Sequence, residues 1–183
     1  MPAIFTSITS TTVTTPASQS VRSLIVLLRL SMAWVFLYAA SHQIFGGFSV
    51  AGFLGATKTF NWLFAPMTAE PVAGVVSVLV GYGHLLIGLS LLTGLLTRVS
   101  ALAGIALMAL YWMAHMNFPY ISDTTNFLLD EHVVYGLVLS LLIATHAGHI
   151  FGLDAWVAQQ RRVARNGSAQ AAHRYRWLDW AVA

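Results

Sequence analysis

Residues 126–156 contain the stretch that most constrains the fold. After two acidic residues and His132, the chain continues with about twenty mostly apolar residues, which is enough to cross a bilayer as a helix. In such a helix His132, Tyr135, Leu139 and His146 lie on one side. Lipid contact does not favour polar side chains, so we expect this side to face protein, a cavity or a cofactor.

The composition predicts an integral membrane protein with one domain. Only 8% of the 183 residues are charged and 57% are hydrophobic, whereas soluble domains carry about 25% charged residues. The absence of cysteine excludes disulfides, iron–sulfur clusters and the thiol–quinone chemistry of small disulfide-generating membrane enzymes. The net charge of +3 resides at the chain ends, and no nucleic-acid partner is predicted.

Four apolar stretches predict an all-α fold, an antiparallel bundle of four transmembrane helices. The predicted spans are residues 21–44, 72–96, 99–116 and 127–151, within a domain of residues 21–156. Arginines concentrate at the chain ends and at Arg98, whereas most acidic residues lie in the two longer loops. Positive residues favour the cytoplasmic side, so both termini are predicted to be cytoplasmic.

The segments outside the spans differ in composition. Residues 1–20 are rich in Ser and Thr and predict a flexible tail, whereas residues 157–183 are basic and contain tryptophans. The basic tail suits an anionic membrane surface, and docking on a partner subunit is the second interpretation. Residues 45–71 are rich in glycine and aromatic residues, which predicts an interfacial segment that covers the bundle.

Arg29 lies two turns inside the first span. A long Arg side chain at that depth can extend to the membrane surface. The alternative is a buried ion pair, for which Asp154 is the best candidate because it lies at the same predicted membrane face.

His84 is the most informative single residue of the second span. Gly74, Gly81 and Gly88 recur every seven residues on one face, and small residues of this kind let helices approach closely in a membrane. His84 shares this packed side near the middle of the bilayer. It is interpreted either as a neutral histidine bonded to a neighbouring helix or as a functional group.

The ends of the third and fourth spans predict a quinone site. Such a site needs aromatic walls and a group that exchanges protons with the quinone oxygens. The proton-exchanging candidates are His132 and His115, with His84 deeper in the membrane, and the candidate walls are Tyr111, Trp112 and Tyr135. The alternative is an aromatic belt with a polar cap.

These histidines are also compatible with two other cofactors, a divalent metal and haem b. Three histidines and three acids near the outer face could bind a divalent metal or relay protons, but no H-E-x-x-H spacing is present, so no metal is predicted. A haem b between His84 and a fourth-span histidine is less favoured, because His132 and His146 lie far from the depth of His84.

Three segments resemble the DoxX/DoxD family of small four-helix membrane proteins. They are LLRLSMAWVFLYAA, GHLLIGLSLLTGLLTRVSALAGIALM and NFLLDEHVVYGLVLSLLIATHAGHIFGLD. The resemblance implies a DoxD-like subunit of a thiosulfate:quinone oxidoreductase in the bacterial inner membrane. The family often has Glu where His84 stands and Gly-x-x-Lys where residues 40–43 read Ala-Ser-His-Gln, and these departures favour a specialised or accessory role.

Two functions are therefore predicted. The first is a membrane subunit of an oxidoreductase or electron-transfer complex that interacts with quinone. The alternative is a non-catalytic subunit that packs against a larger respiratory or photosynthetic membrane complex. Membrane lipid and other membrane-protein subunits are the expected partners in both.

Overall fold

The computed structural model describes residues 18–121, 129–167 and 180–182. The predicted N-terminal tail, except for its last residues, and most of the predicted C-terminal tail lie outside this part of the chain. Asp123, one of the three acids of the predicted outer cluster, also lies outside it.

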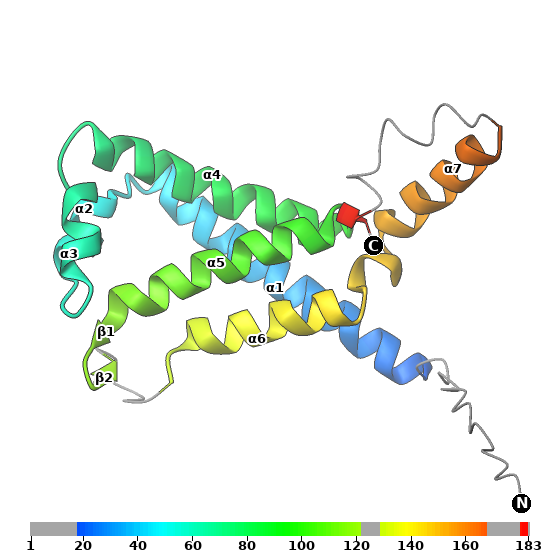
Figure 1. Cartoon of the computed structure of the whole chain (residues 1–183), viewed down its shortest axis with the longest axis horizontal. Coiled ribbons are helices and arrows are strands. Elements are labelled where there is room, and N and C mark those ends of the chain that lie inside the picture. The colour runs from blue at the N-terminus through cyan, green and yellow to red at the C-terminus, as the bar shows by residue number, and fades with distance from the viewer. Residues whose placement is uncertain (1–17, 122–128, 168–179, 183) are drawn as a thin grey trace, which may run out of the picture.

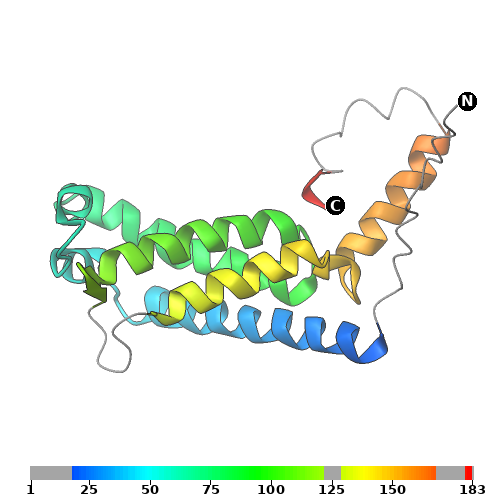
Figure 2. The same cartoon turned by 60° about the horizontal axis from the view of Figure 1, so that its bottom comes forward.

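Four helices form an antiparallel bundle, which confirms the predicted all-α class (Figures 1 and 2). They are α1 (Gln19–Phe45), α4 (Val72–Thr93), α5 (Thr97–His115) and α6 (Glu131–Ala144). In the bundle α1 packs against α4, α4 against α5, α5 against α6, and α6 against α1. Residues far apart in the sequence therefore meet between α1 and the last two helices.

Three of these helices, α1, α4 and α5, are long and apolar enough to cross a membrane. The fourth, α6, has 14 residues, about 21 Å at 1.5 Å per residue, whereas the apolar bilayer core is about 30 Å thick. The helix ends at Ala144 because His146 has a left-handed φ of 49°, and a 3₁₀ turn, η2 (Ala147–His149), follows. The prediction that His146 shares a helix face with His132 is therefore wrong.

The bundle has an apolar centre and an apolar exterior. Phe36, Leu91, Leu139 and Leu142 are fully buried, while many large apolar side chains remain exposed on the helices, as lipid contact requires. Two of the three glycines of the predicted face, Gly81 and Gly88, meet α1, whereas a Cβ on Gly74 would meet only Glu70. A Cβ on Gly88 would lie 2.7 Å from Leu37 Cγ, so only glycine allows this approach.

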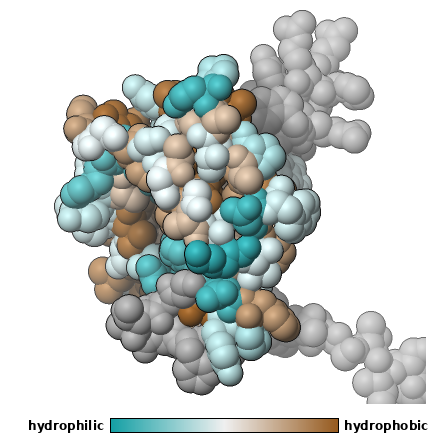
Figure 3. All heavy atoms as spheres, turned by 90° about the vertical axis from the view of Figure 1, so that its left-hand side faces the viewer, coloured by the Kyte–Doolittle hydropathy of each residue, from teal (hydrophilic) through white to brown (hydrophobic). Residues whose placement is uncertain are grey.

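Short elements cover one end of the bundle, which we call the outer end because the sequence predicts that it faces away from the cytoplasm. They are α2 (Val50–Gly55), α3 (Asn61–Phe64), the 3₁₀ turn η1 (Ala65–Met67) and the hairpin of β1 (Met116–Asn117) and β2 (Tyr120–Ile121). Val50, Leu54, Phe64 and Ala114 form a small apolar core there. Hydrophilic and hydrophobic residues alternate over this end (Figure 3).

The opposite end, which we call the inner end, carries η2 and α7 (Leu153–Gly167). Arg29 is buried there, but it donates from Nη1 to the carbonyls of Ala147 (2.6 Å) and Ile150 (3.0 Å) and from Nη2 to that of Phe151 (3.2 Å). Arg29 thus neither extends to the surface nor forms an ion pair with Asp154 within the described structure. All three carbonyls belong to the segment that follows α6, and that of Ala147 also accepts from the backbone N–H of Ile150, so Arg29 joins α1 to this segment.

Asp154, also buried, accepts hydrogen bonds from the backbone N–H groups of Leu96 (2.7 Å) and Thr97 (3.1 Å). These are the first N–H groups of α5, which have no partner within the helix. The two buried charges of the inner end therefore stabilise the backbone of their own chain.

Candidate functional site

Asp130 at the outer end lies between two imidazoles. As the N-cap of α6 it accepts from the backbone N–H of His132 through Oδ1 at 2.6 Å, which is the usual role of Asp before a helix. The same oxygen bonds closely to Nδ1 of His132, and Oδ2 lies 2.5 Å from Nδ1 of His115, the last residue of α5. One carboxylate thus joins the end of α5 to the start of α6.

Accessibility changes along this triad of His132, Asp130 and His115. The carboxylate is 1% exposed, whereas the side chains of His132 and His115 are 14% and 31% exposed. The triad therefore runs from the interior of the bundle through a buried acid to an imidazole that water reaches.

The carboxylate determines which nitrogen of each imidazole is available. Burial alone would raise the pKa of Asp130, but hydrogen bonds from the His132 backbone N–H and from both imidazoles lower that pKa below its usual value. Asp130, which precedes the first residue of α6, is therefore an ionised acceptor near neutral pH. Each Nδ1 then carries a hydrogen, and Nε2 of His132 and His115 remains for other partners.

The triad also offers three atoms that could bind a metal ion, one from each residue, and these atoms all lie within 4.8 Å of one another. Zinc holds its ligands at about 2.1 Å in a tetrahedron, which separates two ligand atoms by roughly 3.4 Å. The 2.5 Å between His115 Nδ1 and Asp130 Oδ2 is shorter than this. We therefore interpret the triad as joined by hydrogen bonds.

A cavity of about 170 Å³ lies beside His132, inside the bundle. Its polar or aromatic lining consists of Phe36 and Gln43 of α1, His84 of α4, Tyr111 of α5, and His132 and Tyr135 of α6. All four bundle helices thus contribute side chains. The remaining lining is apolar and comes from Val35, Ala39 and Met108.

Gln43 introduces an unsatisfied polar atom beside this cavity. Its Nε2 donates to the Tyr111 hydroxyl at 3.2 Å, and its Oε1 is buried without a hydrogen-bond partner. Whichever way the amide is turned, one of its polar atoms bonds to Tyr111 and the other does not. A buried polar atom without a partner is costly, so it indicates a site where a ligand or a water supplies the missing bond.

Tyr111 brings the two deeper histidines into one site. Its ring stacks on His132, with centroids 5.0 Å apart and planes at 10°, and contacts the ring of His84 edge-on at 5.8 Å. A haem between these histidines would need the space that this ring occupies. The geometry therefore favours a ligand smaller than haem.

His84 is buried, and its Nδ1 lies 2.8 Å from the carbonyl oxygen of Val80 one turn earlier. A carbonyl only accepts hydrogen bonds, so Nδ1 donates and Nε2 of the neutral ring is an acceptor. His84 is thus held by its own helix and not by a neighbouring helix, as the first of its two interpretations expected, and it also lines the cavity.

The structure groups most of the predicted site residues and separates one. His84, Tyr111, His132 and Tyr135 line the cavity, and His115 joins them through Asp130. Trp112 does not line it, because the next residue of a helix points about 100° away from Tyr111.

Gln43 was absent from the predicted site, although a signal for it existed. It stands where the resembled pattern has Lys, and His84 stands where that pattern has Glu. The two departures from the pattern therefore line one cavity, which the sequence alone did not show.

These features define a class of protein: multi-pass helical membrane proteins with a polar cavity within the bundle. The DoxX family model matches residues 24–116, which is half of the chain, and the chain belongs to the DoxX family. The match covers α1 to α5 and ends before α6. No curated protein and no solved structure matches the chain.

Proposed function

We propose that the chain is a quinone-interacting subunit of an electron-transfer complex in the bacterial inner membrane, with the quinone ring in the cavity beside Tyr111. The main support is the unpaired Oε1 of Gln43 beside a cavity that also presents His84 and His132. A quinone ring is flat and apolar with two oxygens, which suits aromatic walls and a few polar groups.

The two histidines offer complementary groups to a quinone or quinol. With Nδ1 hydrogen-bonded elsewhere, each uses Nε2, which accepts from a quinol hydroxyl when the ring is neutral and donates to a quinone oxygen when it is protonated. Gln43 Oε1 accepts from the second hydroxyl of a quinol. The Tyr111 ring provides a face against which the quinone ring stacks.

The two histidines supply the protons in this proposal. Reduction of one quinone takes two electrons and two protons. His132 in its protonated form gives its Nε2 proton to one quinone oxygen and keeps the Nδ1 hydrogen bonded to Asp130, whose charge stabilises that form. The second proton comes from Nε2 of His84 in its protonated form, whose Nδ1 stays bonded to Val80. His115, the most exposed member of the triad, shares the same carboxylate at the predicted outer surface.

The electrons come from a redox centre on a partner subunit. The cysteine-free chain offers no thiolate to hold an iron–sulfur cluster, so its own part is to bind the quinone and exchange protons. In the DoxD-like role that the family resemblance implies, the electrons come from thiosulfate and reach the quinone through such a partner. The partner would pack on the exposed apolar faces of the bundle.

The test uses the full-length protein in lipid nanodiscs and a tail-less dimethoxy-methyl-benzoquinone. We expect His132→Gln, which keeps a polar side chain but cannot titrate, and Tyr111→Leu, which removes the stacking face, to weaken binding at least tenfold. Trp112→Phe is the matched control on the same helix turn, and it should bind as the parent does. Quinone extracted from protein purified out of native membranes provides a second readout.

The alternative of a structural subunit predicts a different result. In that case His132→Gln assembles with its partners, and both quinone content and quinone reduction by the complex stay at the level of the parent. That outcome would overturn the quinone proposal.

A further inference from the structure

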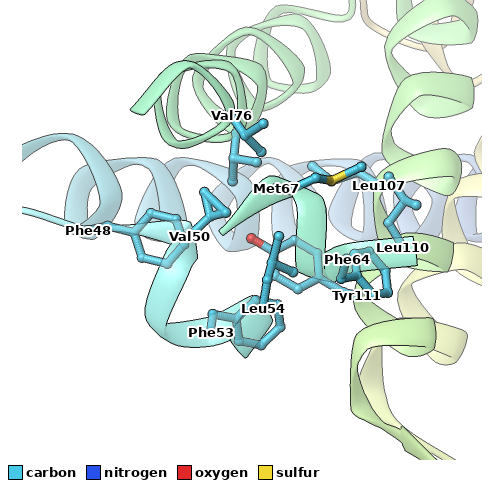
Figure 4. A pocket seen from close by; sticks show the side chains of 11 residues that line it. Phe48, Val50, Phe53, Leu54, Phe64, Met67, Val76, Leu107, Leu110 and Tyr111 are labelled. Atoms are coloured by element: carbon cyan, nitrogen blue, oxygen red, sulfur yellow. The ribbon is translucent and has the colours of Figure 1, made fainter. Parts of the chain in front are cut away.

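A second hollow lies beneath the elements that cover the outer end (Figure 4). Its volume is about 70 Å³. It is lined by Phe48, Val50, Phe53, Leu54, Phe64, Met67, Val76, Val80, Leu107, Leu110 and Tyr111. All of these side chains are apolar except for the Tyr111 hydroxyl, so we call the hollow the apolar pocket.

The apolar pocket adjoins the polar cavity through Tyr111, which lines both. The hydroxyl of Tyr111 bonds to Gln43, which lines the cavity, whereas its ring contacts Phe53 of the pocket at a centroid distance of 5.4 Å. His84 lines the cavity one turn after Val80, which lines the pocket. A polar space and an apolar space thus share one wall.

This pairing restricts the ligand. A polar flat ring fits the cavity, and only an apolar group fits the pocket, because burying a polar group there without a partner is unfavourable. Only the side chain of Tyr111 lines both spaces, so they are close enough for one ligand to carry both groups. A quinone with an isoprenoid tail has this composition, whereas a tail-less quinone leaves the pocket unused.

We propose that the apolar pocket binds the first part of the isoprenoid tail of a membrane quinone, with the rest of the tail in the bilayer. This inference rests on the proposed function, since it assigns the substrate class of the same site. The residues that hold the tail come from α2, the loop before it, α3 and η1 on one side, and from α4 and α5 on the other. The interfacial segment 45–71 thereby forms the tail subsite as well as the cover of the bundle.

The first experiment fills the apolar pocket. Val76→Trp places an indole in it, and Val78→Trp, two residues along α4 and 58% exposed, is the matched control. In nanodiscs we measure the dissociation constants of the tail-less benzoquinone and of the same ring carrying two isoprene units. Val76→Trp should weaken binding of the prenylated quinone at least tenfold and that of the tail-less quinone less than twofold, whereas Val78→Trp should change neither.

The second experiment uses the unaltered protein and does not depend on how a variant folds. Farnesol, an isoprenoid without a quinone ring, should compete with the prenylated quinone and leave binding of the tail-less quinone unchanged. Dodecanol, a straight-chain alcohol without isoprene branches, added at the same concentration, should compete much less. Equal competition by dodecanol would show that the pocket binds any alkyl chain and would overturn the assignment to a quinone tail.

The outcomes separate this inference from the function on which it rests. If the parent binds neither quinone, both proposals fail. If it binds the tail-less quinone, and neither Val76→Trp nor farnesol affects the prenylated one selectively, the tail subsite fails alone. Equal weakening of both quinones by Val76→Trp also overturns the subsite, because the pocket then acts on the ring cavity and not on the tail.

Discussion

The two ends of the bundle each bury charged groups, but they use them differently. At the inner end, Arg29 donates to three carbonyls and Asp154 accepts from two N–H groups, all of the backbone. At the outer end, Asp130 accepts from two imidazoles, and Gln43 keeps an unpaired oxygen beside a cavity. Buried charge stabilises the chain at one end and holds titratable side chains at the other.

The two ends also differ in the volume of the cavities beside their unpaired buried atoms. The inner end also has unpaired buried atoms, Nε of Arg29 and Oγ1 of Thr97. Thr97, however, borders a cavity of only about 10 Å³, which holds at most one water, whereas the cavity of the outer end has about 170 Å³. An unpaired atom therefore indicates a ligand site only where there is room for the ligand.

The prediction with the largest expected effect is that the two ends face opposite sides of the membrane. Reporter proteins fused after Gln160 and inserted within residues 122–125 should be active in opposite compartments, because α6 packs along α5 and returns the chain to the inner end. Alkaline phosphatase and a fluorescent protein provide the two readouts. The same compartment for both positions would show that α6 does not cross, and the comparison of an outer with an inner end would lose its basis.

The next effect concerns the tight packing of the inner end. A Cβ on Gly148 would overlap Oδ2 of Asp154 and lie 2.5 Å from Thr97 Oγ1, whereas one on Gly136 in α6 would meet nothing within 4 Å. Gly148→Ala should lower the free energy of unfolding by about 3 kcal/mol, and Gly136→Ala should change it by less than about 1 kcal/mol. Thermal unfolding in detergent provides the measurement, and equal stability of the two variants would contradict the packing described here.

The sequence predicted the three long helices and the grouping at the outer end, because both depend on local patterns. Apolar run length gives the helices, and the spacing of Tyr111 and His115 or of His132 and Tyr135 gives shared helix faces. The partners across helices were not predictable in this way. Gln43 meets Tyr111 over a separation of 68 residues, and periodicity within one helix does not show which helix lies opposite.

Arg29 illustrates a second limit. Its neighbourhood was predicted correctly and its partner was not, because the carbonyls that it contacts become available only where the chain turns after α6. His146 produces that turn with a positive φ, a conformation rare for residues other than glycine. No pattern in the sequence indicated that a left-handed residue would end the helix within this apolar run.

The third prediction examines the carboxylate of the outer end. Asp130→Asn keeps an oxygen for the His132 N–H but removes the negative charge between the imidazoles. We expect at least tenfold weaker quinone reduction by the assembled complex and a loss of only about 1 kcal/mol in stability. Glu131→Gln, at the next and exposed position, is the control and should match the parent; a Glu131→Gln defect as large as that of Asp130→Asn would remove the special role of Asp130.

The fourth prediction follows from the lowered pKa of Asp130. A carboxyl whose pKa is lower in the folded state adds stability above its unfolded pKa, about 3.9, and that stability is lost as the pH falls through the folded pKa. The parent should therefore lose stability more steeply than Asp130→Asn below about pH 4. Unfolding midpoints measured over this range give the comparison, and parallel curves throughout would contradict the lowered pKa.

The smallest expected effect concerns Trp180, near the C-terminus. The sequence left open whether the basic, tryptophan-containing tail contacts the membrane or a partner subunit. In the structure the guanidinium of Arg98 lies 5.1 Å from the centre of the Trp180 ring, so this part of the tail packs on the inner end of its own chain. A cation–π contact at a half-exposed site contributes about 0.5–1 kcal/mol.

Trp180→Ala should therefore lower stability by about 1 kcal/mol and leave quinone binding unchanged, because the ring belongs to the inner end. Trp156→Ala on α7 is the control, since that side chain is 60% exposed. The double variant of Trp180→Ala with Arg98→Gln should be no less stable than Arg98→Gln alone if the two groups act only through each other. A change in quinone affinity with Trp180→Ala would show that the two ends are coupled, and the division between a structural end and a binding end would then be wrong.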